Sequence, residues 1–521
     1  MDARQALNPA KPTKFSPYDI VAGISVALVV IPQSLAYAEL AGLPAYVGLF
    51  AAAIPPILAA FFASSPYLQT GPVAMTSLLT FGVLAQFSAP TASVEYMKLA
   101  ALLAVMVGVI RIVLGLIGGG VVAYLMSKPV LAGFTSAAAI LITVSQFPKI
   151  VGSISDGRGL WQDAGSALVG TWDWRSVGLS LVTVVLVLGA RYVHPLFPGV
   201  LAAMLVGLGY SLITSYDGPV IGAVPVGFPP LSAALPWGSM ADLVVPAIVI
   251  ALVGFAEPSA IARTYANLDR QAWDPDRELV SQGVANLAAG FSSAFPVGGS
   301  FSRSSVARLS GARTRAAGAV AGITVLLFLP FAHIIEPLPS AVLGAIVIAG
   351  VYKLIRIPEI FSIWRYSRLQ AMVAITTFVL TLALAPRIDL AVMVGIVMGI
   401  SVHLWRELHL DVESWTVGTV VHLMPRGVLY FGSAPGLGTH LNEELAAHPD
   451  ARAVTIELQG LGRIDYTGAL ALKQAVAEAE EANLTVRLAN VPDHARRVLS
   501  KVWEGSLPEL TVNVVRLDET T

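Results

Sequence analysis

Long apolar stretches, repeated through the first 411 residues, constrain this 521-residue chain more than any other feature. Hydrophobic residues make up 55% of the chain and charged residues only 12%, against about 25% charged residues in a soluble domain. A bilayer core of about 30 Å needs roughly 20 helical residues. Fourteen stretches are predicted as membrane segments, near residues 18–41, 43–63, 72–87, 98–118, 121–147, 176–193, 195–215, 242–262, 278–291, 302–312, 316–335, 338–354, 369–386 and 388–405.

The last 110 residues have a different composition and pattern. They hold 23 of the 65 charged residues, and their apolar segments are short and rich in β-branched residues. Strands alternating with helices indicate a small α/β domain. The strands are expected near 417–424, 427–431, 453–458, 484–488 and 512–515, and the helices near 438–447, 468–482 and 492–502.

The expected organisation is a cytoplasmic N-terminal segment (1–15), a membrane domain (16–411) and a cytoplasmic α/β domain (412–521). The membrane segments form two series of seven, which gives repeats of about 16–220 and 240–411. An odd number of segments per repeat places two similar halves in opposite orientations, as in secondary transporters. The loop Lys and Arg residues favour cytoplasmic N- and C-termini in the cell (inner) membrane.

The third segment of each series is short and follows a glycine-containing stretch. In the first, Gly71 and Pro72 mark a helix start, because proline at the first turn gives up an amide hydrogen that has no partner there. In the second, Ser300 to Arg303 follow Gly298 and Gly299. Two such half-helices in inverted repeats would point their positive N-termini at one another, which favours an anion. The alternative is that Gly71 and Pro72 only pack two helices closely and Arg303 caps a cytoplasmic loop.

Two acidic residues, Glu39 and Glu257, lie inside apolar segments. Carboxylates within a membrane are costly when charged, so they indicate function or a paired partner. Both are therefore candidates for binding a coupling ion. The alternatives are that Glu39 faces water at the outer interface and that Glu257 forms a static pair with Arg303.

Gln33 and Tyr37 lie four residues apart and share one face of the first segment, after Pro32. Both can offer donors to a cavity or simply pack helices together. Arg111, within the fourth segment, is expected to snorkel or to be paired. In the α/β domain, Asp465 or Thr467 is a candidate N-cap for the helix from Gly468, and Thr467 is a conceivable phosphate acceptor.

The sequence offers no enzyme site. The chain has no cysteine, its net charge of -1 includes no basic run, and its eight histidines show no metal-ligand spacing. No nucleophile with a base is evident, and Gly118 to Gly120 lack the strand and helix of a nucleotide loop. No cofactor, metal or nucleic acid is therefore expected.

The segment from Ile31 to Pro44, IPQSLAYAELAGLP, with the Gly71-Pro72-Val73-Ala74 that follows, closely resembles the signature of the sulfate-permease (SulP) anion transporters. The Ile464 to Gly468 segment resembles a loop of the STAS domain. The resemblance covers nearly the whole chain. It implies fourteen membrane segments in two inverted repeats, divided into core and gate domains, with a cytoplasmic STAS domain and a homodimer.

The resemblance also implies a site. The family's anion-binding positions fall on Gln33, Tyr37, Gly71, Pro72, Val73, Ser300, Phe301, Ser302 and Arg303. Glu257 matches the acidic position that lies beside the anion in cation-coupled relatives, and Glu39 favours proton over sodium coupling. The expected function is therefore proton-coupled symport of small anions, such as sulfate, bicarbonate or dicarboxylates, by an elevator-like movement. An anion channel, a voltage-responsive motor and a nucleobase permease remain alternatives.

Overall fold

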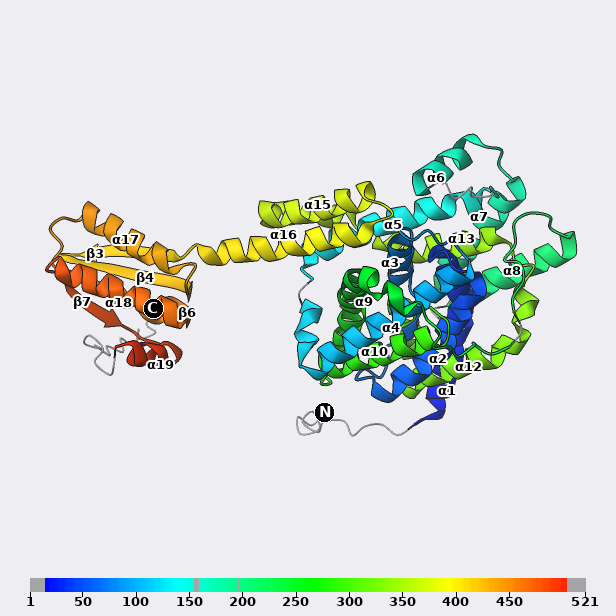
Figure 1. Ribbon diagram of the computed structural model, residues 1–521, viewed down its shortest axis with the longest axis horizontal. Helices are drawn as coiled ribbons and strands as arrows, with labels where there is room; N and C mark the ends of the chain where they lie inside the picture. The colour runs from blue at the N-terminus through cyan, green and yellow to red at the C-terminus, as the bar shows by residue number, and fades with distance from the viewer. Residues whose placement is uncertain (1–14, 125, 154–158, 195, 226, 504–521) are drawn as a thin grey trace. The chain divides into compact units, whose positions relative to one another are not determined.

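The computed structural model describes residues 15–124, 126–153, 159–194, 196–225 and 227–503 (Figure 1). The chain divides into two compact units, residues 1–399 and 400–521. The predicted N-terminal segment, apart from residue 15, and the strand predicted near 512–515 lie outside the described residues.

The first unit is helical. Its α-helices are α1 (Pro17–Leu40), α2 (Ala45–Phe62), α3 (Ala74–Leu84), α4 (Val94–Leu116), α5 (Lys128–Ile150), α6 (Leu160–Val169), α7 (Trp174–Val193), α8 (Gly199–Thr214), α9 (Met240–Asp269), α10 (Pro275–Phe291), α11 (Phe301–Leu309), α12 (Ala316–Phe328), α13 (Ser340–Val351), α14 (Ile357–Tyr366), α15 (Arg368–Ala383) and α16 (Ile388–Leu408). Each of the fourteen predicted stretches coincides with one of these helices. Helices α6 and α14 were not predicted as membrane segments.

Among the described residues, eight helices are long and apolar enough to cross a membrane, or nine if the bent pair α6 and α7 counts as one span. Helices α3, α8 and α15 are apolar but shorter. The fourteen crossings therefore remain a prediction. The segment predicted near 121–147 begins later, because Gly119–Tyr124 forms a separate 3₁₀ helix, η2, after Gly118 with φ +75°.

The start of α1 is fixed by a buried carboxylate. Ser16 caps the helix, and Asp19 completes a capping box. Asp19 Oδ1 also accepts hydrogen bonds from the backbone N–H groups of Arg313 and Thr314, at 2.7 and 2.9 Å. One aspartate thus joins α1 to the segment between α11 and α12.

Glycines allow the helices around α2 to approach closely. A Cβ at Gly48 of α2 would lie 1.8 Å from the backbone oxygen of Ser34 in α1, and one at Gly322 of α12 would lie 2.4 Å from that of Ala53 in α2. In a membrane, such small-residue contacts replace the hydrophobic driving force between helices. Helices α1, α2 and α12 therefore form a tightly packed group.

Two short strands join the two halves of this unit. Strand β1 (Thr70–Gly71) pairs antiparallel with β2 (Gly298–Gly299). Each strand leads into a short helix, β1 into α3 and β2 into α11. The pairing therefore brings together two helix starts that are more than 200 residues apart in the sequence.

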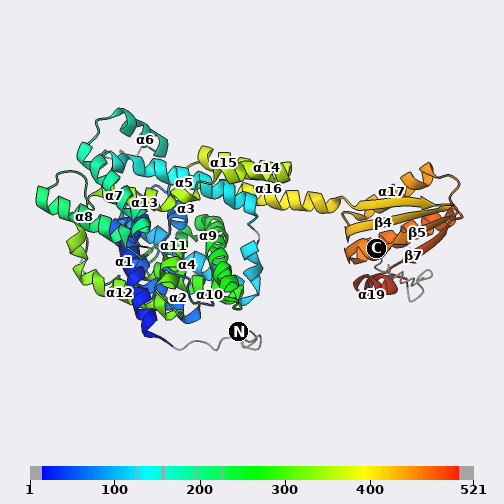
Figure 2. The same cartoon turned by 180° about the vertical axis from the view of Figure 1, so that it is seen from behind.

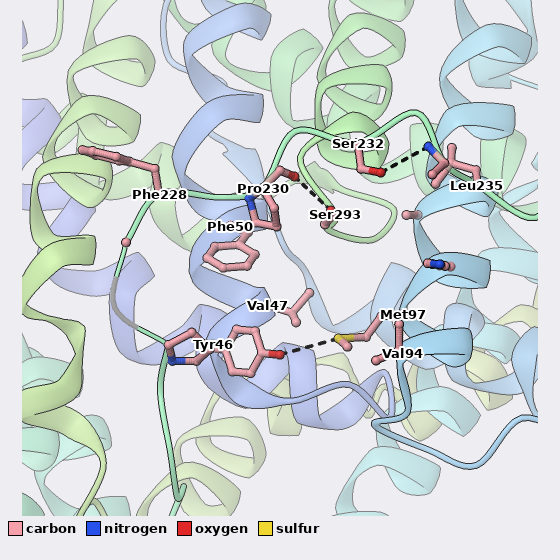
Figure 3. Close-up of a pocket in the computed structure, with 15 residues that line it drawn as sticks. Tyr46, Val47, Phe50, Val94, Met97, Phe228, Pro230, Ser232, Leu235 and Ser293 are labelled. Atoms are coloured by element: carbon pink, nitrogen blue, oxygen red, sulfur yellow. Dashed lines mark hydrogen bonds between the residues drawn. The ribbon is translucent and has the colours of Figure 1, made fainter.

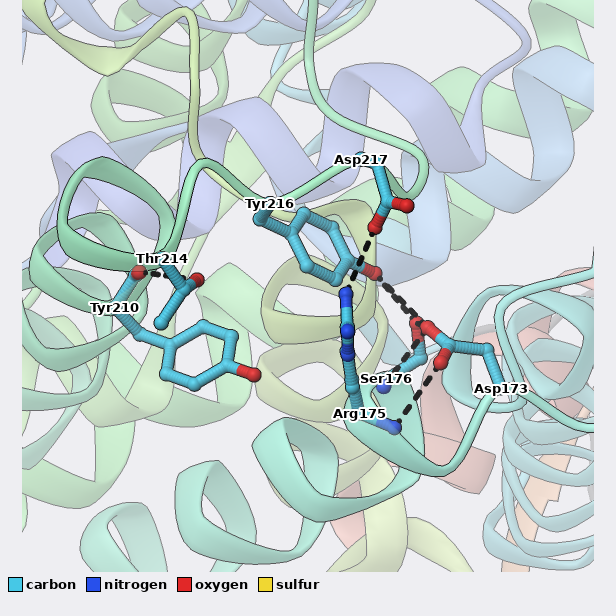
Figure 4. Close-up of polar contacts among 7 residues, drawn as sticks. All are labelled: Asp173, Arg175, Ser176, Tyr210, Thr214, Tyr216 and Asp217. Carbon is cyan, nitrogen blue, oxygen red and sulfur yellow. Dashed lines mark hydrogen bonds and ion pairs between the residues drawn. The ribbon is translucent and has the colours of Figure 1, made fainter.

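Polar contacts fix the beginning of α7 (Figure 4). Asp173 caps α7 and accepts hydrogen bonds from the N–H groups of Arg175 and Ser176. The Ser176 hydroxyl lies 2.6 Å from that of Tyr216, and Arg175 forms an ion pair with Asp217. These contacts tie α7 to the segment that follows α8.

The second unit contains a five-stranded sheet. Its elements are β3 (Asp411–Val417), β4 (Val420–Leu429), β5 (Ala453–Glu457), β6 (Leu461–Ile464), β7 (Thr485–Ala489), α17 (Ala434–Ala447), α18 (Tyr466–Glu481) and α19 (Asp493–Val502). The strand order is β3-β4-β5-β7, with β6 paired to β4. Helix α18 lies in front of the sheet in Figure 1, and the strands lie in front when the unit is viewed from behind in Figure 2.

Two strand predictions in this unit were wrong in detail. The strands expected at 417–424 and 427–431 are one strand, β4, with a register shift between Gly427 and Val428. Strands β3 and β6 were not predicted. Asp465 is the N-cap of α18 and accepts a 2.7 Å hydrogen bond from the Gly468 N–H, whereas Thr467 lies within the helix and is exposed.

Candidate functional site

The N-termini of α3 and α11 adjoin one another. The Ser300 N–H donates to the Gln69 carbonyl at 3.1 Å, next to the β1–β2 pair. From the first turn of α11, Arg303 Nη1 donates to the Pro72 carbonyl, just before α3, at 2.8 Å. The two helix starts predicted from Gly71–Pro72 and Ser300–Arg303 are therefore part of one structure.

Neither helix start is capped by a side chain. The N-cap residues are Val73 for α3 and Ser300 for α11, and neither side chain accepts a hydrogen bond from its helix. The first amides of each helix have no partner within the helix and carry its positive partial charge. The arrangement concentrates hydrogen-bond donors and positive charge at a place where, among the described residues, neither N-cap side chain accepts from its helix.

Arg303 adds a full positive charge at this place. Its side chain is fully buried, and neither Nε nor Nη2 has a hydrogen-bond partner among the described residues. Glu257 lies close enough to Arg303 and to the Phe301 N–H to interact with both electrostatically. Within the described part of the chain, however, the two side chains form no ion pair within 4.0 Å. A static Glu257–Arg303 ion pair is thus not observed, and Arg303 instead donates to the Pro72 carbonyl between β1 and α3.

The polar face of α1 borders the same place. Gln33 and Tyr37 are both buried, and Gln33 Oε1 has no partner among the described residues. Tyr37 interacts electrostatically with Arg303 and Glu257, and its hydroxyl lies near Gly350 of α13. The structure therefore brings Tyr37 to the predicted site, and Gln33 lies one turn before it on α1, buried.

The three residues before Arg303 contribute unequally. The Ser300 hydroxyl lies 3.2 Å from that of Ser302, and Ser302 is exposed. The Phe301 ring stacks on Tyr265, with 6.2 Å between ring centroids, and is 54% exposed. The Phe301 ring therefore packs on Tyr265, and it is the backbone N–H of Phe301 that lies toward Glu257.

Glu39 lies in a different environment from Glu257. Its Oε2 forms an ion pair with Lys149 Nζ of α5 at 2.7 Å, and its side chain is 16% exposed. Glu39 is therefore mostly shielded from water by a partner that the sequence analysis did not identify. The two predicted coupling acids occupy separate positions, one beside Arg303 and one between α1 and α5.

Several polar residues near the site were missed. Gln282 Nε2 donates to Thr70 Oγ1 at 2.7 Å, and Asn286 exchanges two 3.0 Å hydrogen bonds with the Val297 backbone. Gln282 and Asn286 lie four residues apart on α10, so their shared face was a readable signal. Arg111 is fully buried and donates only to backbone carbonyls, whereas the sequence suggested snorkelling or pairing.

A cavity of about 410 Å³ lies elsewhere in this unit (Figure 3). Its wall is mainly apolar and includes Tyr46 and Phe50 of α2, Met97 of α4, and Phe228 and Leu235 of the segment before α9. It contains none of the predicted site residues. Among the described residues, no group of three or more His, Asp or Glu side chains is arranged to hold a metal ion.

Comparison with known families agrees with this architecture. Residues 17–377 match the sulfate permease family, and residues 412–504 match the STAS domain. The chain belongs to the sulfate permease family, which consists of transporters and not of enzymes. The predicted family and the predicted fold, a helical membrane protein with a C-terminal α/β domain, are both confirmed.

Individual relatives share about a third of their residues with this chain over the aligned region. The chain is 32% identical over 375 residues to a probable sulfate transporter of Mycobacterium tuberculosis, and 32% identical over 419 residues to the chloroplastic sulfate transporter 4.1 of Arabidopsis thaliana. These alignments cover 70% and 78% of this chain but 66% and 61% of the relatives, so the chain spans less than two thirds of their length.

A solved structure shares the fold. The murine Solute Carrier 26 family member A9 anion transporter, in its inward-facing state, matches with a TM-score of 0.83 and 21% sequence identity. The match covers 94% of this chain and 88% of that one. At this identity the likeness concerns the fold alone.

Proposed function

We propose that this protein is a secondary active transporter of small anions and that the anion binds between the N-termini of α3 and α11. The observation that carries the proposal is the meeting of two uncapped helix starts around Arg303, whose buried Nε and Nη2 atoms have no hydrogen-bond partner within the described part of the chain. An anion in hydrocarbon would pay a Born energy on the order of tens of kcal/mol. These donors substitute for its lost water.

Each predicted binding residue has a part in this proposal. The backbone N–H groups of Gly71 and Val73 and those of the first turn of α11, from Phe301 to Arg303, are the proposed amide donors, and the Arg303 guanidinium provides charge. Pro72 has no N–H and serves to start α3, and the Ser300 N–H is already bound to the Gln69 carbonyl. Gln33 and Tyr37 close the site from α1. Donors of this kind suit sulfate, bicarbonate or a dicarboxylate, so the substrate class is proposed at that breadth.

The proposed coupling ion is a proton, with sodium as the competing outcome. Glu257 supports this role because it lies beside Arg303 without forming an ion pair. Glu39 is the second candidate, and its pairing with Lys149 links α1 to α5. Elevator-like movement of the site-bearing helices against α5 and α13 would break and remake this contact, which allows protonation to be coupled to movement.

Radiolabelled uptake into proteoliposomes tests the transport proposal. Sulfate, bicarbonate and succinate serve as probes, with and without an imposed pH gradient. R303Q is expected to abolish saturable uptake, because it removes the charge between the two helix starts. R308Q is the matched control, because Arg308 lies on the same helix but pairs with Asp269 outside the site. Uptake that survives R303Q would contradict the proposed site.

The same assay tests coupling. E257Q and E39Q together are expected to abolish stimulation by an inward proton gradient, whereas the wild type accumulates anion above equilibrium. Stimulation of uptake by a sodium gradient, and not by a proton gradient, would identify sodium as the coupling ion. Large anion currents that reverse at the anion's equilibrium potential would instead identify the protein as an anion channel. Competition by uracil for uptake would identify it as a nucleobase permease.

The proposed setting is a homodimer in the cell membrane, with both termini in the cytoplasm. Membership of a multi-pass transporter family supports the membrane location. The distribution of Lys and Arg between the loops supports the orientation.

A further inference from the structure

Arg111 is a cation deep within the membrane unit, and it neither reaches water nor pairs with an acid. Its side chain is fully buried on α4. Its Nε donates to the Ala251 carbonyl at 3.1 Å, Nη1 to that of Val297 at 3.2 Å, and Nη2 to that of Ile250 at 3.1 Å. Among the described residues, no carboxylate forms an ion pair with it. Its positive charge is therefore solvated by neutral dipoles and is not cancelled.

The carbonyls that hold Arg111 belong to elements that build the anion site. Ile250 and Ala251 lie on α9, within two turns before Glu257. Val297 directly precedes β2, the strand that leads into α11. Asn286 of α10 also accepts from the Val297 N–H and donates to its carbonyl, both at 3.0 Å. Arg111 and Asn286 together fix the backbone from which α11 begins.

Gly254 shows how close Arg111 lies to the start of α3. A Cβ at this position of α9 would be 2.5 Å from Arg111 Nη2 and 3.2 Å from Cγ2 of Thr76, in the first turn of α3. The guanidinium and the first turn of α3 thus meet at the same glycine. The charge lies directly behind the two helix starts and does not line them.

An uncancelled charge at this position acts on an anion at the site. Charges within a protein interact through an effective dielectric constant of about 20, and buried charges are weakly screened by salt. Holding the backbone requires only hydrogen-bond donors, which a neutral side chain also has. The charge itself stabilises a bound anion in proportion to the charge that the anion carries.

We propose that Arg111 is a positioning residue that favours divalent over monovalent anions. It does so without touching them, by fixing the start of α11 and by making the potential at the site positive. This inference rests on the proposed anion transport. It adds a selectivity determinant that lies outside the residues bordering the anion.

Coulomb energy is linear in ligand charge, which gives the test a quantitative form. If removing the Arg111 charge weakens a monovalent anion about threefold, it should weaken a divalent one by the square of that factor, about tenfold. We would measure the KM of sulfate and of bicarbonate uptake in proteoliposomes for the wild type, R111Q and R111K. R111Q is expected to raise the sulfate KM by about the square of its effect on bicarbonate. R111K, which keeps the charge, is expected to preserve the wild-type ratio of the two KM values.

An equal loss for both anions in R111Q, or no loss, would overturn the inference, because a purely structural residue has no preference for charge. If R111Q does not reach the membrane, R111K alone tests the inference. A ratio of sulfate KM to bicarbonate KM in R111K that differs from the wild-type ratio would also overturn the inference. Absence of anion uptake in the wild type would contradict the proposed function. Wild-type uptake with an unchanged ratio in R111Q would contradict only the role of Arg111.

Discussion

Glu39 and Lys149 join α1 to α5 through side chains that are 16% and 26% exposed. Because solvent partly screens this pair, its contribution to stability is about 1 kcal/mol. K149Q and E39Q are each expected to lower the thermal unfolding midpoint in detergent. The double variant should unfold at a temperature no lower than that of the less stable single variant, because the ion pair is already lost in each single variant. The measurement is a double-mutant cycle from thermal unfolding curves. Strictly additive losses would show that the two side chains do not interact.

The residues at the site differ in how far the sequence predicted them. Gln33 and Tyr37 were predicted because their four-residue spacing and the family signature agree. Lys149 and Asn286 were not, because each acquires its role from a partner in another element, Glu39 on α1 or the Val297 backbone before β2. The spacing of Gln282 and Asn286 could mark a polar face of α10, but not what that face contacts. Spacing within one helix does not reveal such partners.

At the level of elements, the contact of α1 with α2 depends on Gly48. A methyl group there would lie 1.8 Å from the Ser34 carbonyl oxygen, so G48A must push the two helices apart. We expect G48A to destabilise the protein by about 1–3 kcal/mol and to reduce uptake, because Ser34 neighbours Gln33.

The matched control is G209A on α8, where a Cβ would meet no atom within 4 Å. It should leave both the unfolding temperature and uptake near wild-type values. Thermal unfolding and uptake of the two purified variants, measured side by side, check the prediction. Equal behaviour of G48A and G209A would rule out a specific role for this helix contact.

Element prediction succeeded where hydrophobicity is continuous and failed where it is not. The fourteen apolar stretches coincide with helices. In the second unit, β3 was missed because its side chains are largely exposed, and β4 was divided in two because Pro425 and Arg426 interrupt its apolar pattern. Strand β6 is only four residues long and depends on pairing with β4.

At the scale of the whole molecule, the absence of cysteine allows a direct test of orientation. Single cysteines would be introduced at Trp172, between α6 and α7, and at Thr467 on α18, both of which are exposed. A membrane-impermeant maleimide applied to intact cells is expected to label W172C, because that segment lies outside when the N-terminus is cytoplasmic. T467C should be labelled only after permeabilisation. The reverse pattern would invert the proposed orientation.

Hydropathy alone does not determine how many times the whole molecule crosses the membrane. Helices α10 and α11 are only 17 and 9 residues long and contain Gln282, Asn286 and Arg303, so neither counts as a long apolar span, although all three side chains are buried. Each of these side chains donates at least one hydrogen bond within the protein, Gln282 to Thr70, Asn286 to Val297 and Arg303 to Pro72, which helps to make burial compatible with the membrane. A hydropathy profile alone cannot record that compensation.

The pairing of Thr70 and Gly71 with Gly299 and Gly298 has a mechanical consequence. Backbone hydrogen bonds tie the beginnings of both half-helices together, so neither can be displaced without pulling the other. A solute held between them would not be released by separation of the two helix N-termini. The bound solute would move together with both half-helices as one rigid body, and the remaining helices of the unit would form the stationary surface along which that body moves.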